Sequence, residues 1–272
     1  MTQEIEFYKM HGLGNDFVIV SDKALQHIAE KELFIKAISD RRTGIGCDQF
    51  ITYQHVQGNR YNMNIFNSDG SKAEACGNGT RCLTKLLHNI YRGTNFNIIS
   101  AGRSLDSTLS REYVSVNMGR ASLQEEWMVQ DNEIMNISDL FGINIKEVIQ
   151  IDVCNPHLVI FTNQLTTKDK QLFSQQINDS NLYKNGVNIG FAKSAKNHID
   201  LDVWERGVGP TLACGSGACA CFVAAQKFGF SDNKAKINFK LGSLDMSQKG
   251  EDIIMTGPAS FIGKGDYYYE GK

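Results

Sequence analysis

The sequence predicts an α+β fold of two pseudo-symmetric domains, each built from many strands around one buried central helix. Three observations support this prediction: an internal repeat, strand-like segments throughout both halves, and one strongly apolar helical segment in each half. A chain of 272 residues is long enough for more than one domain, and its 42% hydrophobic and 21% charged residues are ordinary for a globular protein.

The internal repeat is centred on two cysteines, Cys76 and Cys214. Residues 63–82, MNIFNSDGSKAEACGNGTRC, align without a gap with residues 201–220, LDVWERGVGPTLACGSGACA, at an offset of 138 residues. A second pair, GNDFVIV (14–20) and CNPHLVI (154–160), has an offset of 140. Coincidence of common Gly and Ala residues is the alternative. Two similar domains explain the nearly constant offset better, and we expect one of residues 1–118, completed by 261–272, and another of residues 119–260.

The expected elements follow from local composition. Segments rich in β-branched and aromatic residues predict strands at 16–20, 49–53, 62–66, 96–100, 113–118, 157–161, 188–192, 199–205, 236–240, 244–248 and 252–256. Amphipathic outer helices are expected over 25–39 and 166–178.

A helix is expected directly after each Cys-Gly pair and ends at a glycine, over 79–93 and 215–229. The first has an apolar face of Cys82, Leu83, Leu86, Leu87 and Ile90. The second is apolar nearly all round, which predicts a fully buried helix.

Composition excludes several classes of protein. The net charge of −2 provides no basic field for nucleic acid or an anionic membrane. The polar N-terminus, MTQEIEFYKMHG, is not a secretory signal, and the run ACACFVAA is far shorter than the roughly 20 residues of a membrane helix. Seven cysteines, an odd number, then indicate free thiols in a reducing cytoplasm, and no dinucleotide or P-loop fingerprint is present.

The position of both cysteines at a predicted helix start suggests chemistry. A helix N-terminus presents unpaired N–H groups and a partial positive charge, which stabilise a thiolate and bind a carboxylate. Two such helix starts facing each other would hold one carboxylate with a thiol on each side. The neighbouring glycines allow the close backbone approach that this requires: Gly77, Gly79, Gly215 and Gly217.

Two thiols on opposite faces of one carbon are what stereoinversion needs. One thiolate removes the α-proton, and the opposite thiol delivers a proton to the other face. The converging N–H donors stabilise the charge that develops on the substrate carboxylate. The sequence therefore predicts α-proton chemistry without a pyridoxal or other cofactor, and without a metal.

Other roles for these residues stay open on the residues alone. Cys76 and Cys214 could form a structural disulfide, and the chain could be a zinc or redox module, although CNPH (154–157) and CACF (219–222) lack the Cys-x-x-Cys spacing of a zinc knuckle. His157 and Glu205 fall near the cysteines in the repeat and are candidates for tuning a thiol. A core role is the alternative for His157. Four other cysteines are expected to be small buried hydrophobes: Cys47, Cys82, Cys219 and Cys221.

Several motifs together resemble the diaminopimelate epimerase family. They are KMHGLGNDF (9–17), GIGCDQF (44–50), NSDGSKAEACGNGTR (67–81), NPH (155–157), NIGF (188–191), WERGVGPTLACGSGACA (204–220) and MTGPA (255–259). They occur in the family's order and span nearly the whole chain. In the related proline racemases the first cysteine is typically followed by Gly-His-Gly, and the related phenazine-pathway isomerases lack the cysteine pair.

The resemblance implies two domains, each a β-sheet barrel around a central helix, with a cleft between them. It implies cofactor-independent interconversion of LL- and meso-diaminopimelate in lysine and cell-wall precursor synthesis, by a cytoplasmic homodimer. It assigns Cys76 and Cys214 as the acid/base pair and His157 and Glu205 as the groups that adjust them. The reacting end of the substrate would meet Gly77, Asn78, Gly215 and Ser216.

The resemblance also implies partners for the distal end of the substrate, a zwitterion that needs both donors and acceptors. For each asparagine alone a turn role is the alternative, and another racemase of this fold with a smaller substrate is the alternative for the protein. A small substrate would not need all of these residues: Asn15, Gln49, Asn67, Asn155, Asn188, Glu205 and Arg206.

Overall fold

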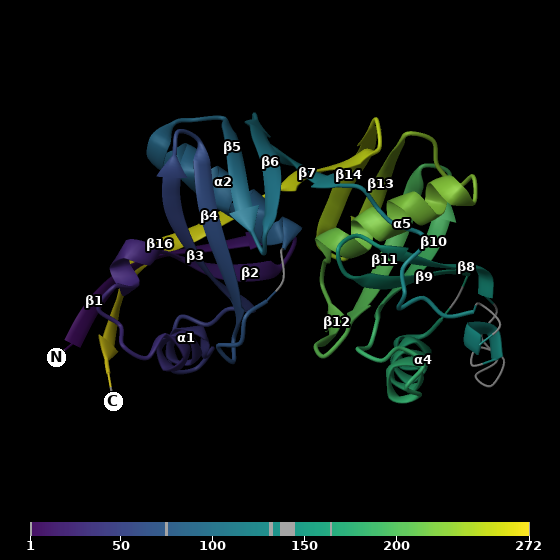
Figure 1. Cartoon of the computed structure of the whole chain (residues 1–272), viewed down its shortest axis with the longest axis horizontal. Helices are drawn as coiled ribbons and strands as arrows, with labels where there is room; N and C mark the ends of the chain where they lie inside the picture. The colour runs from purple at the N-terminus through teal and green to yellow at the C-terminus, as the bar shows by residue number, and fades with distance from the viewer. Residues whose placement is uncertain (1, 74–75, 131–132, 137–144, 164, 272) are drawn as a thin grey trace. The chain divides into compact units, whose positions relative to one another are not determined.

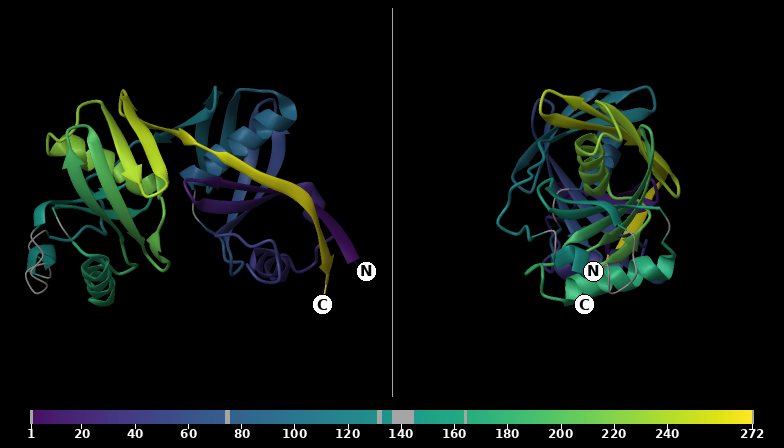
Figure 2. Two further views of the ribbon diagram at one scale, coloured as in Figure 1. Left: turned by 180° about the vertical axis from the view of Figure 1, so that it is seen from behind. Right: turned by 90° about the vertical axis from the view of Figure 1, so that its right-hand side faces the viewer.

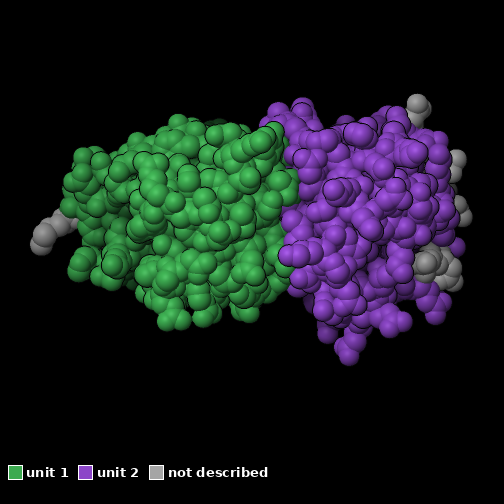
Figure 3. Space-filling view, turned by 90° about the horizontal axis from the view of Figure 1, so that it is seen from above, with its two compact units in different colours: residues 1–117, 256–272 green, residues 118–255 purple. Residues whose placement is uncertain are grey.

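The computed structural model describes residues 2–73, 76–130, 133–136, 145–163 and 165–271. They form two compact units, coloured separately in Figure 3: unit 1 is Met1–Asn117 with Thr256–Lys272, and unit 2 is Met118–Met255. In each unit a sheet wraps around one helix (Figure 1), so the predicted α+β class with one central helix per half is confirmed.

In unit 1, the sheet has the strand order β16-β1-β2-β3-β4-β5-β6-β7. Helix α1 (Lys31–Ser39) connects the parallel strands β2 and β3, and α2 (Gly77–Tyr91) connects the parallel strands β4 and β5. The C-terminal strand β16 pairs along β1, so the two ends of the chain lie side by side (Figure 2). The strand bounds are β1 Thr2–Gly12, β2 Asn15–Ser21, β3 Gln49–Gln57, β4 Arg60–Asn67, β5 Asn95–Ser100, β6 Arg103–Ser110, β7 Tyr113–Gly119 and β16 Ser260–Glu270.

In unit 2, the order β8-β9-β10-β11-β13-β14-β15 repeats the order of β1 to β7 in unit 1. Helix α4 (Thr167–Asp179) connects the parallel strands β9 and β10, and α5 (Gly215–Lys227) connects β11 and β13, which are also parallel. Strand β11 begins and ends 138 residues after β4, the offset of the sequence repeat. The strand bounds are β8 Ile145–Asp152, β9 Pro156–Thr162, β10 Asn188–Ala195, β11 His198–Glu205, β12 Gly209–Thr211, β13 Lys234–Phe239, β14 Gly242–Lys249 and β15 Asp252–Pro258.

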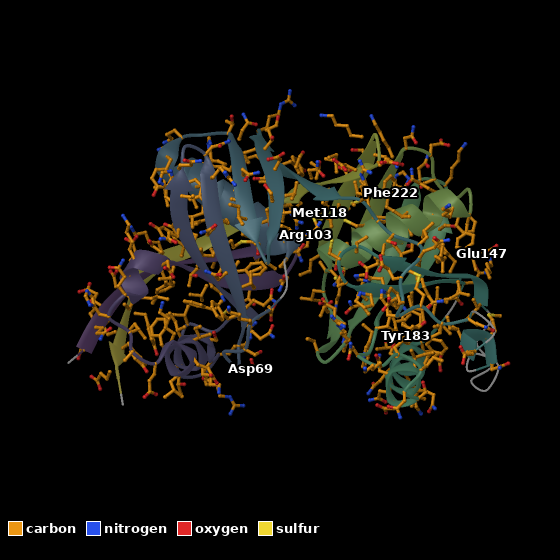
Figure 4. The ribbon with its side chains drawn as sticks, in the orientation of Figure 1. Asp69, Arg103, Met118, Glu147, Tyr183 and Phe222 are labelled. Atoms are coloured by element: carbon orange, nitrogen blue, oxygen red, sulfur yellow. The ribbon has the colours of Figure 1, made fainter. Side chains whose placement is uncertain are left out.

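Both central helices are largely buried, although the sequence predicted this only for the second. Helix α5 is buried on nearly all sides, and its Phe222 (Figure 4) is fully enclosed. Helix α2 packs Cys82, Leu83, Leu86 and Leu87 into the core of unit 1. Ile90, which the same spacing places on that face, is instead 37% exposed, because the last turn of α2 is exposed.

The outer helix expected over 25–39 is shorter in the structure. Helix α1 begins at Lys31, and a separate 3₁₀ turn covers Asp22–Leu25. Leu25 and Ile28 still reach the core, but from outside the α-helix. The spacing of apolar residues alone did not distinguish the 3₁₀ turn from α1, because both elements contribute apolar residues to the same core.

Five strands lie outside the expected set: β1, β6, β8, β12 and β16. Strand β6, RSLDSTLS, shows why, because only alternate residues are buried and the exposed positions are polar. A segment with so few apolar residues does not stand out from a loop by composition. No helix in the described ranges is long and apolar enough to span a membrane.

Candidate functional site

Cys76 and Cys214 are the N-cap residues of the two central helices. Both have extended backbone conformations, and each sulfur accepts a hydrogen bond from an N–H in the first turn. Gly79 N lies 3.5 Å from Cys76 Sγ, and Gly217 N lies 3.4 Å from Cys214 Sγ. Each thiol thus lies where a helix dipole favours negative charge.

Gly79 and Gly217 lie close to strand side chains. A Cβ at Gly79 would come within 2.9 Å of Ile51 Cδ1, and one at Gly217 within 3.1 Å of Val203 Cγ2. A Cβ at either position would force the strand side chain or the helix start to shift. Glycine therefore allows each helix start to lie close to its sheet.

In unit 1, the predicted residues Asn15, Cys76 and Asn78 come together. The side-chain amide oxygen of Asn15, Oδ1, lies 3.8 Å from Cys76 Sγ and accepts a hydrogen bond of 3.2 Å from Asn78 Nδ2. Asn15 Nδ2 donates to Asp48 Oδ2 at 3.1 Å. Gln49 and Asn67 form a second pair at the ends of β3 and β4, with Gln49 Nε2 3.5 Å from Asn67 Oδ1.

A charged cluster is connected to Asn15 through Asp48. Arg41 donates to the carboxylates of both Asp16 and Asp48 at 2.7 Å, and Lys9 bonds Asp16 and the carbonyl oxygen of Gly46. Burial by itself raises the pKa of Asp16, but hydrogen bonds from Arg41 and Lys9 outweigh it and lower this pKa to about 2. Asp16 is therefore ionised at neutral pH. The family motifs contain Lys9, Asp16 and Asp48, but none of these residues was predicted as part of the site, and Arg41 lies outside the motifs.

In unit 2, Cys214 is linked to His157 through a serine. Ser216 Oγ lies 3.4 Å from Cys214 Sγ and 3.0 Å from His157 Nε2. Asn155 completes this group, with Nδ2 3.2 Å from Ser216 Oγ and Oδ1 3.1 Å from His157 Nε2. The four predicted residues are together, but the contact between histidine and thiol runs through the Ser216 hydroxyl.

His157 is neutral at physiological pH. It is 1% exposed, and burial, followed by the positive charge of Arg206, lowers its pKa to about 3. A neutral imidazole can accept or donate one proton toward Ser216. It acts on the thiol as a hydrogen-bonding group rather than as a cation.

The buried His157 makes unit 2 sensitive to acid. Its pKa in the folded chain lies below the unfolded value of 6.5, so the unfolded state binds more protons between about pH 3 and 6.5. This contribution destabilises the fold as the pH falls through that window, by at most about 1.4 kcal/mol per pH unit. We expect His157→Gln to lose less stability on acidification, measured by urea unfolding at about pH 7 and about pH 5.

The exposed His55 provides the control for this experiment. His55→Gln should leave the difference between the two pH values as in the parent. An unchanged difference in His157→Gln would contradict the buried neutral histidine.

Asn188, Glu205 and Arg206 form the remaining part of unit 2's predicted set. Asn188 Oδ1 accepts from the Arg206 backbone N–H at 3.0 Å, and its Nδ2 donates to the carbonyl oxygen of Pro156 at 3.0 Å. Arg206 Nη1 donates to Asn185 O at 3.3 Å. Glu205 accepts from Thr211 Oγ1 at 2.7 Å, a partner that the sequence did not indicate. The effect of Glu205 on a thiol stays a prediction.

All seven cysteines are free thiols in the structure. Cys47, Cys82, Cys219 and Cys221 are buried, as expected for small hydrophobes. Burial raises the pKa of Cys82 to about 12 and also raises that of Cys221, so both stay protonated. In the described part of the chain, no group of three or more His, Cys, Asp or Glu side chains could hold a metal ion.

Sequence comparison settles the family. The profile described as diaminopimelate epimerase matches residues 7–124 and 149–262, which include both cysteine-capped helices. The chain belongs to the diaminopimelate epimerase family. The diaminopimelate epimerase of Rickettsia bellii is 44% identical over 271 residues, covering 99% of this chain and 100% of that protein. That of Rickettsia typhi is 42% identical over 272 residues, with the same coverage.

Solved structures agree with this family at the level of the fold. A predicted epimerase from Pseudomonas aeruginosa has a TM-score of 0.75 at 12% identity, covering 97% of this chain and 99% of that one. A hydroxyproline epimerase from Agrobacterium vitis, with bound trans-4-hydroxy-L-proline, has a TM-score of 0.66 at 10% identity, covering 98% and 91%. The predicted α+β barrel-like fold is therefore confirmed.

Proposed function

We propose that this chain is an isomerase, an amino-acid epimerase that interconverts LL- and meso-2,6-diaminopimelate without a cofactor. It would serve amino-acid biosynthesis, supplying precursors for lysine and peptidoglycan. The observation that carries this proposal is the repeated site, in which a cysteine caps each central helix of a diaminopimelate epimerase family member.

The proposed reaction uses Cys76 and Cys214 as catalytic cysteines. One thiolate takes the α-hydrogen as a proton, and the electron pair of the broken C–H bond delocalises into the substrate carboxylate. The other thiol gives its proton to the opposite face of the same carbon. At the end the two sulfurs have exchanged protonation states, so no net oxidation occurs and no proton is consumed.

The helix starts supply binding energy where charge develops. The proposed donors to the reacting carboxylate are the backbone N–H groups at the first helical positions, because a helix start presents its N–H groups to an anion. They favour the carbanion-like intermediate over the bound substrate because its carboxylate carries more charge. These positions are Gly77, Asn78, Gly215 and Ser216.

We propose that the distal ammonium and carboxylate meet the amide-rich set around the cysteines. Arg206 is the proposed partner of the distal carboxylate, because its planar guanidinium can bind both oxygens. The other members are Asn15, Gln49, Asn67, Asn155, Asn188 and Glu205. Asn15, Asn155 and Asn188 are held by the hydrogen bonds described above, which supports a site with fixed geometry.

We further propose that residues 1–118 with 261–272 and residues 119–260 act as the two epimerase domains, each supplying one thiol. The proposed functional form is a cytoplasmic homodimer. Support comes from β16 at the edge of the sheet of unit 1, where Phe261, Ile262 and Tyr268 are 46%, 55% and 62% exposed. Sedimentation equilibrium would test the dimer, and a monomer at working concentration would exclude it.

The reaction is tested by incubating the protein with LL-diaminopimelate in deuterated water. We expect meso product with deuterium at the inverted α-carbon, resolved by chiral chromatography and mass spectrometry. Proline and hydroxyproline serve as parallel substrates, because solved neighbours of this fold include a hydroxyproline epimerase. Turnover of those compounds without turnover of diaminopimelate would replace the proposal by a racemase with a smaller substrate.

A further inference from the structure

The two cysteines have corresponding surroundings that differ in the side chain beside the sulfur. Asn15 is the first residue of β2 and Asn155 directly precedes β9, so the two correspond, and Asn78 and Ser216 both lie two residues after a cysteine. Each asparagine bonds its partner on the helix, at 3.2 Å in both units. In unit 2, however, the group beside the sulfur is the Ser216 hydroxyl, whereas in unit 1 it is the carbonyl oxygen of Asn15.

The orientation of the Asn15 amide is fixed by Asp48. An ionised carboxylate can only accept hydrogen bonds, so the group of Asn15 that faces Asp48 Oδ2 at 3.1 Å must be its NH₂. The carbonyl oxygen then faces Cys76, and it also accepts from Asn78 Nδ2. Asp48 therefore determines which end of the amide the sulfur meets.

Asp48 is itself held at several points, although its side chain is 45% exposed. Its Oδ2 also accepts from the backbone N–H of Asp16 at 3.1 Å, and its Oδ1 accepts from Arg41 Nη2 at 2.7 Å. Its own backbone N–H donates to Asp16 Oδ1 at 2.9 Å. A carboxylate held by three donors keeps the neighbouring amide in one orientation.

We propose that Asp48 is a positioning residue that holds the Asn15 carbonyl against Cys76, so that Cys76 is the protonated thiol of the resting protein and Cys214 its thiolate. A carbonyl oxygen can accept a hydrogen bond from S–H. Its partial negative charge repels a thiolate, so it favours the protonated form of Cys76. Each sulfur accepts an N–H from the first turn of its helix, so the difference lies in the neighbouring side chain: at Cys214, the Ser216 hydroxyl can donate to the sulfur. This inference rests on the proposed function, because it assigns the starting states of the two acid/base groups.

Alkylation by iodoacetamide tests Cys76 directly, since the thiolate is the reactive form. The rate at Cys76 is followed as a function of pH in the Cys214→Ala background, with peptide mass mapping to separate Cys76 from the exposed Cys154. Asp48→Ala removes the acceptor, so the Asn15 amide can present its NH₂ to the sulfur. We expect the midpoint of the plot of Cys76 alkylation rate against pH to move down by about one pH unit. This corresponds to alkylation up to about tenfold faster at neutral pH.

Asp48→Asn separates orientation from charge. It removes the negative charge but keeps an oxygen that can accept from Asn15 Nδ2, so we expect most of the shift to disappear. Equal shifts in the Ala and Asn variants would overturn the proposal, because charge alone would then explain both. Absence of a shift in both would overturn it as well, and the Asn variant keeps this result interpretable if the Ala variant folds poorly.

Asp106→Ala is the matched control. Asp106 is an exposed carboxylate of unit 1 that accepts from the amide of Asn97 at 2.6 Å, on strands β5 and β6. Its loss should leave the alkylation profile of Cys76 unchanged. A shift of the size seen for Asp48→Ala would mean that any lost carboxylate changes this thiol, and would overturn the assignment to Asp48.

The assignment of Cys76 as the resting thiol and Cys214 as the resting thiolate can also be tested in the unaltered chain, by the order in which the two are alkylated. At neutral pH, Cys214 should be alkylated before Cys76, and the opposite order would overturn the proposal. These measurements need no turnover, so they are independent of the reaction with diaminopimelate. Failure of the proposed function would appear as absent epimerisation in the parent, whereas failure of this inference would appear in the alkylation profiles alone.

Discussion

Replacing either Cys76 or Cys214 with alanine should abolish epimerisation. Each variant lacks one of two obligatory proton carriers, and loss of a positioned acid/base group typically costs about 10²–10⁴-fold in rate. Each sulfur lies at its helix start, where Cys76 Sγ contacts Asn15 and Gly79 and Cys214 Sγ contacts Ser216 and Gly217. Formation of meso-diaminopimelate from the LL isomer measures the effect.

The fold should survive both substitutions. Each sulfur caps one helix by accepting a single N–H, and loss of an N-cap acceptor costs about 0.5–2 kcal/mol. Thermal unfolding should therefore show modest destabilisation. Cys154→Ala, which removes an exposed thiol next to Asn155, is the control and should keep activity. Turnover at nearly the parent rate in either cysteine variant would show that the two-thiol mechanism is wrong.

Arg206→Met and Arg206→Lys should lose activity mainly through substrate recognition. Removal of one partner of a desolvated charge pair costs about 2–5 kcal/mol, and lysine cannot reproduce the guanidinium fork. The backbone N–H of Arg206 that bonds Asn188 is retained in both variants, whereas the guanidinium and its bond to Asn185 are lost. We expect a raised KM, with diaminopimelate no longer protecting Cys76 and Cys214 from iodoacetamide.

The matched control is Arg120→Met, an arginine of unit 2 that is 70% exposed and paired with Glu251 on the surface. It should keep the parent KM and substrate protection. Normal substrate binding by the Arg206 variants would make Arg206 a structural residue and remove it from the distal site.

The repeat predicted the central elements well because it is local and strongly patterned. The strand and helix around each cysteine depend on a few neighbouring residues, and β4 and β11 match at the predicted offset. Where packing decides, the sequence was less informative. Ile90 continues the apolar spacing of α2, yet it lies beyond the part of the helix that the sheet covers.

The partners of the site residues were the least predictable part. Asp48 reaches Asn15 only because β2 pairs with β3 in parallel, with Phe17 opposite Gln49. His157 is linked to Cys214 through Ser216. His157 and Ser216 are 59 residues apart in sequence, and they meet because β9 and the start of α5 are adjacent in space. Such contacts depend on strand register and helix placement, which no short motif encodes.

The path of the chain through unit 1 has a consequence for biosynthesis. Unit 2 is one continuous stretch, Met118–Met255, whereas unit 1 is completed by residues from Thr256 onward. Thr2 at the start of β1 pairs with Glu270 near the C-terminus. On the ribosome, the second unit therefore has its whole sequence before the first does. The edge of β1 therefore stays open to other chains until β16 has been translated.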